Sequence, residues 1–154
     1  MSSIQLDWQI ACANPQGLPK QAEFQRWVTP AVQQHYTAAE ITIRLVDAEE
    51  SQQLNQHYRA LAYPTNVLAF PNQALITLNP PLLGDLVICR QVVENEAHEQ
   101  QKPLLAHWAH MVIHGTLHLL GYQHDNESTA QEMESLEIQI LQALGYANPY
   151  VTTV

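Results

Sequence analysis

The chain contains 154 residues, of which 46% are hydrophobic and 14% are charged, and its formal net charge at pH 7 is −9. This length and composition, without internal repeats or low-complexity runs, predict one globular domain, residues 1–154, with a core of its own. The acidic balance argues against a uniformly basic surface of the kind that nucleic-acid binders normally present.

The first half of the chain alternates between strand and helix patterns. Its first residues carry neither the basic segment nor the apolar run of a secretory signal, so we expect a cytoplasmic protein. Alternating apolar and polar residues indicate strands, and apolar residues at a spacing of three or four indicate helices. Pro30 is expected to kink or break the first helix, and Asp47 to cap the second. The expected elements are strand 4–10, a helix from 19 or 20 to 36, strand 40–46 and helix 48–61.

The second half is richer in helices. The stretch 85–89 is too apolar to be solvated on both faces, so we expect it within the sheet or near its rim. Apolar residues nearly encircle the helix that begins at Pro103, which predicts a buried helix. The glutamates of the last helix are most simply a solvated face. The expected elements are strand 66–70, strand 85–89, helix 90–100, helix 103–120 and helix 128–144.

Two features allow a second interpretation. The uncharged span 103–124 is long enough to raise the question of a membrane helix, but its five histidines and Gly121 argue against one. Cys12 and Cys89 are too few for a disulfide framework and lack metal-ligand spacing, so we expect both to be small apolar residues in or near strands.

Three histidines near the end of the buried helix form the strongest motif. One helical turn separates His114 from His118, which places both rings on one face. Gly121 can end the helix with a left-handed cap and return His124 toward the same point. Three imidazoles with one open position are typical of a catalytic zinc site rather than a structural one. The spacing therefore predicts one Zn²⁺ ion held by His114, His118 and His124.

The same motif leaves alternatives open. Its spacing equals that of the metzincin proteases, but Gly115 stands where those enzymes have the Glu that acts as general base. Either the substrate needs no carboxylate there, or another part of the chain accepts the proton. His107 and His110 lie on the same helix face as His114 and His118, so His110 and His114 are a formal alternative as the metal-binding pair. We assign His110 to packing or to contact with a ligand. The interpretation without a metal is a buried helix whose histidines have hydrogen-bond partners in the fold.

The order of the expected elements predicts an α+β fold. We expect a single small mixed sheet of about four strands packed against helices. The metal-binding helix, similar to the zinc helix of the metzincins, should lie buried at the centre.

The stretch HGTLHLLGYQH, residues 114–124, resembles the signature of the YbeY family, bacterial metal-dependent endoribonucleases implicated in ribosomal RNA maturation. Residues 54–59 with 64–71 resemble the second block of that family, and residues 83–89 its third, so the resemblance covers nearly the whole chain. The chain departs from the family pattern in 72–81 and at three positions: Gln123 and Asn66 replace common Asp residues, and Ala69 replaces a common Ser. If the Asp at position 123 orients a ligand, its loss weakens metal binding or turnover.

The resemblance also bears on Arg59. From the local sequence alone, Arg59 is a solvated cation that supports the dipole at the end of its helix. The resemblance implies a catalytic Arg59 that holds a phosphate and stabilises transition-state charge. All six Lys and Arg residues precede the metal motif and the C-terminal segment is acidic, so RNA should approach from the Arg59 side.

The resemblance implies a zinc-dependent endoribonuclease that favours single strands. It would act in ribosomal RNA maturation, including the 3′ end of the small-subunit RNA, and in ribosome quality control. The implied partners are RNA and ribosomal or ribosome-associated proteins, with no membrane and no DNA. Two alternatives remain: a metzincin-like metalloprotease, supported by the spacing and opposed by Gly115, and a non-catalytic ribosome-assembly factor whose metal stabilises the fold.

Overall fold

The protein is described by a computed structural model that covers residues 3–72 and 80–151. The elements of this part follow the predicted order of strands and helices. Most of the segment 72–81, where the sequence departs from the family pattern, lies outside the described residues. The elements are β1 (Ser3–Ile10), α1 (Gln21–Val32), β2 (Ala38–Val46), α2 (Ala48–Arg59), β3 (Val67–Pro71), β4 (Leu82–Cys89), α3 (Arg90–Glu99), α4 (Leu104–Leu119) and α5 (Glu127–Ala143).

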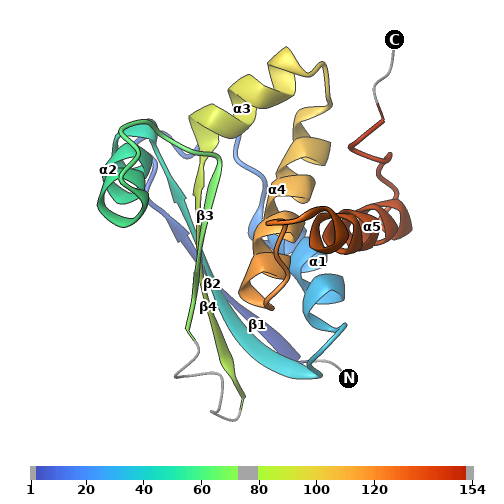
Figure 1. The fold of residues 1–154 in the computed structure, drawn as a ribbon. Coiled ribbons are helices and arrows are strands. Elements are labelled where there is room, and N and C mark those ends of the chain that lie inside the picture. The colour runs from blue at the N-terminus through green and yellow to red at the C-terminus, as the bar shows by residue number, and fades with distance from the viewer. Residues whose placement is uncertain (1–2, 73–79, 152–154) are drawn as a thin grey trace.

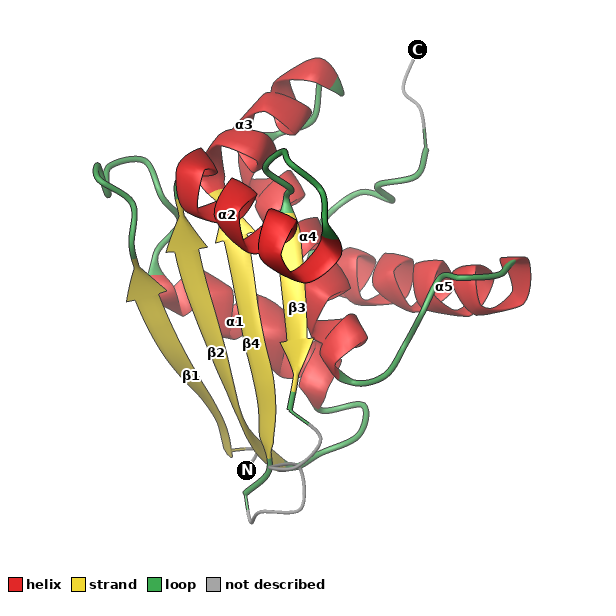
Figure 2. Ribbon diagram, turned by 60° about the vertical axis from the view of Figure 1, so that its left-hand side comes forward, coloured by secondary structure: helices red, strands yellow, loops and turns green. Residues whose placement is uncertain are grey.

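The four strands of the described chain form one mixed sheet with the order β1-β2-β4-β3. β1, β2 and β4 are parallel, and β3 pairs antiparallel with β4 at the edge. Figure 2 shows β3 pointing opposite to its three neighbours. Pro71, at the end of β3, has no N–H to donate, which suits an edge strand. The predicted mixed sheet of about four strands is therefore confirmed.

One face of the sheet carries the main core. Ile41, Ile43 and Leu45 alternate along β2 with more exposed residues and are buried, as the period of two predicts. α1 and α4 meet over this face through an aromatic cluster, in which Phe24 lies 5.3 Å from Trp27 and 5.8 Å from Trp108 between ring centroids. Figure 1 shows α4 between the sheet and α5. The prediction of a central, buried α4 is confirmed.

The opposite face of the sheet has a smaller cluster under α2. Its buried members are Val46, Leu68, Val87 and Cys89. Figure 2 shows α2 over one end of the strands, with the rest of that face uncovered by helices. The helices are therefore distributed unequally, and the α4 side holds most of the buried volume.

Several element boundaries differ from the prediction. α1 continues through Pro30 and ends at Val32, four residues earlier than expected. Pro103 precedes α4 instead of forming its first turn. The Asp47 carboxylate, expected to cap α2, accepts hydrogen bonds from the backbone of Ala13 and the side chain of Gln91. A long-range contact thus replaces the local cap.

Within 3–72 and 80–151, no helix combines the length and the apolar character needed to cross a bilayer.

Cys12 and Cys89 are free thiols, the first just after β1 and the second buried at the end of β4. Both occupy the kind of position that the sequence predicted.

α4 approaches the sheet closely at Gly115. A Cβ atom there would lie 2.9 Å from Leu86 Cδ2 and 3.0 Å from Val67 Cγ2, closer than carbon atoms pack. Gly115 therefore lets the helix lie directly on β3 and β4. A glutamate at the position where the metzincins carry their general base would have to displace the side chains of Leu86 and Val67.

Gly115→Glu should destabilise the fold by about 1–3 kcal/mol, because its Cβ must displace the side chains of Leu86 and Val67. Urea unfolding followed by circular dichroism measures the change. Leu105→Glu, in the first turn of the same helix at a side chain that is 42% exposed, is the control and should change stability by no more than about 0.5 kcal/mol. Equal stability of the two variants would refute the packing argument.

Candidate metal centre

The structure brings the three histidines of the motif together. His114 and His118 lie on α4, and His124 lies on the loop that follows it. Their ring centroids are 4.6 Å (His114–His118), 4.9 Å (His118–His124) and 5.5 Å (His114–His124) apart. Each ring offers one nitrogen within 4.8 Å of the other two. The predicted convergence is thus present, and the role of the three residues as ligands stays a prediction.

Gly121 produces the turn that returns His124. Its φ is +102°, a conformation that L side chains rarely adopt. The Gly121 N–H donates to the His118 carbonyl at 3.1 Å, and the Tyr122 N–H donates to the Leu117 carbonyl at 3.0 Å. These two bonds form a Schellman motif at the end of α4. The local sequence signal for a glycine cap therefore describes the turn correctly.

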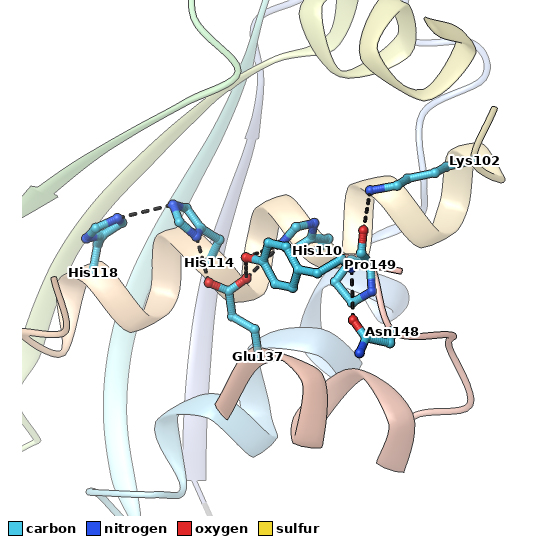
Figure 3. A network of polar contacts seen from close by, with 8 residues as sticks. Lys102, His110, His114, His118, Glu137, Asn148 and Pro149 are labelled. Carbon is cyan, nitrogen blue, oxygen red and sulfur yellow. Dashed lines mark hydrogen bonds and ion pairs between the residues drawn. The ribbon is translucent and has the colours of Figure 1, made fainter. Parts of the chain in front are cut away.

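The hydrogen bonds of His114 and His118 fix which nitrogen faces the centre. The Tyr122 carbonyl can only accept, so His118 Nδ1, at 2.9 Å from it, carries the proton. His114 Nδ1 donates to Glu137 Oε1 at 2.8 Å. The Nε2 atoms of the two rings then face each other at 3.2 Å (Figure 3). Two ring nitrogens this close can bind one cation together, so the donor set fits a metal ion.

The protonation state of His118 suits a ligand. Burial, followed by the neighbouring His114 and His124, lowers the pKa of His118 to about 4. The imidazole is therefore neutral at pH 7, which metal binding requires.

Glu137 of α5 corrects the expectation that the glutamates of this helix are solvated. Its side chain is 0% exposed and accepts hydrogen bonds from His114, His110 and Tyr150. Burial raises the pKa of Glu137, but the hydrogen bonds from His110 and His114 outweigh it and lower the pKa to about 2. An ionised carboxylate therefore holds His114 from behind, an arrangement common at metal sites.

A signal for Glu137 was present in the sequence. Met133, Ile140 and Leu141 are buried on α5, and Glu137 lies four residues after the first and four before the last. Positions at that spacing share one helix face. Reading the apolar face of α5 strictly would have placed Glu137 inside, although its partners could not have been named.

His110 contacts Glu137 and does not face the three-histidine cluster. It is 7% exposed, and its Nε2 lies 2.7 Å from Glu137 Oε2. His110, His114 and Glu137 form a second group whose ligand atoms lie within 4.8 Å of one another. In that group the ligand atoms of His110 and His114 hydrogen-bond to the carboxylate, whereas the three-histidine cluster lies on a cleft. The cluster is therefore the better candidate for a metal, and His110 is connected to it through Glu137, which binds His114.

His107 and Asn66 meet at another carboxylate. His107 Nε2 lies 2.9 Å from Glu96 Oε1, and the Asn66 amide donates to both Glu96 oxygens at 3.2 and 3.3 Å. An aspartate at position 66 would bring a second carboxylate against Glu96. The departure of Asn66 from the family pattern is thus matched by a partner that accepts hydrogen bonds.

A cleft of about 520 Å³ lies beside the three histidines. β3 forms part of its wall, and Arg59, the last residue of α2, lines it together with the histidines. Gln123 also lines the cleft and is exposed. No lining residue in the described chain is a carboxylate, so none replaces the base missing at Gly115. The lining residues are Arg59, Thr65, Asn66, Val67, Leu68, Ala69, Pro71, His114, Gly115, His118, Tyr122, Gln123 and His124.

Most other cations of the chain are bound within the fold. Among the described residues, the salt bridges that Lys and Arg side chains make to Asp or Glu pair Arg44 with Glu50 and Arg90 with Glu94, and do not include Arg59. Arg26 and Lys102 donate to the backbone carbonyls of Leu144 and Pro149. The guanidinium of Arg59 is therefore free, among the described contacts, to meet an anion in the cleft.

Two comparisons bear on the identity of this site. A family model described as "Endoribonuclease YbeY" matches residues 10–145. The solution structure of TM1509 from Thermotoga maritima, a structural genomics target, is similar to this chain with a TM-score of 0.58. The two are 22% identical, and the similarity covers 89% of this chain and 91% of the other. At that identity, the second comparison supports the fold alone.

Loss of a residue that hydrogen-bonds to a metal ligand typically lowers metal affinity by about 10- to 100-fold. His124→Ala removes a proposed ligand itself, so it should lower the affinity for Zn²⁺ by more than that. His124 is exposed, so the variant should fold normally. Competition with a chromogenic chelator measures the affinity. His98→Ala, at an exposed histidine in the last turn of α3, is the matched control and should bind as the wild type does. Wild-type affinity in His124→Ala would remove His124 from the ligand set.

Proposed function

The chain belongs to the YbeY endoribonuclease family, and on that premise we propose that it is a zinc-dependent endoribonuclease that cleaves single-stranded ribosomal RNA. Enzymes of this family hydrolyse phosphodiester bonds in ribosomal RNA maturation. The observation that carries the proposal is the cleft itself, which Arg59 and three convergent histidines line together, with no carboxylate among its lining residues in 3–72 and 80–151.

His114, His118 and His124 would hold the metal. Their three nitrogens favour Zn²⁺ over Mg²⁺ or Ca²⁺, which prefer oxygen ligands. Bound there, zinc would supply Lewis-acid polarisation of a phosphoryl oxygen and a more acidic water. The fixed Nδ1–H of His114 and of His118 keeps both rings oriented toward the ion.

Arg59 would bind the scissile phosphate. Its planar guanidinium matches two phosphate oxygens and can stabilise the charge that develops on the equatorial oxygens in the transition state. A cleft without carboxylates does not repel a phosphodiester, although the whole chain has a charge of −9. RNA would therefore enter from the α2 side, away from the acidic α5.

The two alternative functions receive less support. A metalloprotease of the metzincin kind needs a glutamate at position 115, where this chain has a glycine packed against Leu86 and Val67. A metal that only stabilises the fold would sit in a closed cage of ligands, whereas His124 is exposed and the cluster lies on a cleft. Catalysis accounts for the open side of the site.

The cellular setting belongs to the same proposal. Residues 1–154 would act as a single catalytic domain in the cytoplasm, on RNA and with ribosomal or ribosome-associated proteins, in maturation of the small-subunit RNA and in ribosome quality control. Membrane and DNA are not among the proposed partners.

Arg59→Ala should lower kcat/KM for cleavage of single-stranded RNA by about 100- to 1,000-fold, because a positioned charge is lost from the transition state. Zinc content should not change, since Arg59 is not a proposed ligand. Arg44→Ala, which breaks the 2.7 Å pair with Glu50 on the face of the sheet opposite α4, is the matched control and should cleave normally. Unaltered cleavage by Arg59→Ala would end the proposed role of this residue.

Chelation should abolish RNA cleavage, and Zn²⁺ should restore it. Mg²⁺ alone should fail, because three imidazoles provide none of the oxygen ligands that it prefers. Cleavage of a labelled single-stranded RNA, with metal analysis of the same samples, checks both statements. Full activity of the metal-free protein would contradict the proposal.

A further inference from the structure

A network of polar contacts connects the C-terminal segment, residues 146–151, to the candidate metal centre. It runs from Tyr150 through Glu137 to His114, and Figure 3 shows the Glu137 carboxylate between the side chains of His110 and His114 on α4. Tyr150 O–H donates to Glu137 Oε2 at 2.6 Å. Segments far apart in the sequence thus meet at one buried carboxylate.

The two oxygens of Glu137 have different partners. Oε1 accepts from His114 Nδ1 at 2.8 Å, and Oε2 accepts from His110 Nε2 at 2.7 Å and from Tyr150. Because the carboxylate is 0% exposed, these donors supply the solvation that water would otherwise give it. Loss of one donor to Oε2 would leave the carboxylate free to rotate, and Oε1 would then be shared between His114 and the remaining donor.

The C-terminal segment is held at both ends of its path over α4. At one end, Trp27 of α1 donates to the Tyr146 hydroxyl at 3.1 Å. At the other, Lys102 donates to the Pro149 carbonyl at 2.7 Å, and the Tyr150 N–H donates to the Asn148 side chain at 2.9 Å. These contacts fix the direction in which Tyr150 leaves the backbone.

Burial of the aromatic ring does not explain Tyr150. The residue remains 43% exposed, so its ring contributes little to the core. Its hydroxyl, in contrast, makes the shortest contact that the carboxylate has. The specific contribution of this side chain is therefore a hydrogen bond to Glu137.

We propose that Tyr150 is a positioning residue for the metal centre: with His110, its hydroxyl holds the Glu137 carboxylate so that one oxygen stays on His114 Nδ1. The carboxylate, bound to Nδ1, then holds the ring with Nε2 directed at the metal site and makes the ring a stronger donor. The C-terminal segment is in this way a part of the site. The inference rests on the metal ligands of the proposed function.

The test compares Tyr150→Phe with Tyr146→Phe in the full chain. Each variant removes one hydroxyl from the same segment, but Tyr146 contacts Trp27 and not Glu137. Tyr150→Phe should weaken Zn²⁺ binding by about tenfold, the lower end of the range for partners of ligands. Tyr146→Phe should bind Zn²⁺ as the wild type does. Chelator competition gives the affinity, and thermal melting of the metal-free proteins shows whether both variants fold.

A double-mutant cycle shows whether Tyr150 acts through Glu137. Glu137→Gln should weaken Zn²⁺ binding more than Tyr150→Phe does, and the double variant should bind no worse than Glu137→Gln alone. Additive losses, wild-type affinity in Tyr150→Phe, or an equal loss in Tyr146→Phe would each overturn the inference. His114→Ala separates it from the proposed function, because wild-type affinity in that variant would reject the metal site itself.

Discussion

α4 lies directly on the sheet at Gly115, and this close approach is the constraint on which the candidate site depends. It brings the helix surface that carries His114 and His118 beside the edge strand β3, so that strand, helix and the end of α2 enclose one cleft. A larger residue at 115 would have to displace the side chains of Leu86 and Val67.

The second feature that defines the site is a carboxylate inside the core. Desolvation of Glu137 is costly, and three hydrogen-bond donors offset that cost. The result is a fixed negative charge inside the core behind His114, whereas the cation Arg59 lines the cleft.

An acidic protein can bind RNA when its few cations are placed well. Arg44 and Arg90 are neutralised by glutamates, and Arg26 and Lys102 bind backbone carbonyls. Arg59 has no such partner among the described salt bridges and lines the cleft. The net charge of −9 describes the whole surface, whereas binding at a cleft depends on the charges that line it.

The sequence by itself determined the order of the elements, the mixed sheet and the spacing of the three histidines, because these follow from residue periodicity and from contacts within one or two helical turns. The return of His124 belongs to the same class, since the cap of α4 consists of local bonds from Gly121 to His118 and from Tyr122 to Leu117. Only the tertiary structure identified the partners of Glu137 and Tyr150 on α4, which lie 23 to 40 residues away in the sequence. It also decided that Arg59 shares a cleft with the histidines and that Asp47 bonds to Ala13 instead of capping α2. Such contacts depend on how helices pack over a sheet, and no local pattern in the chain encodes that arrangement.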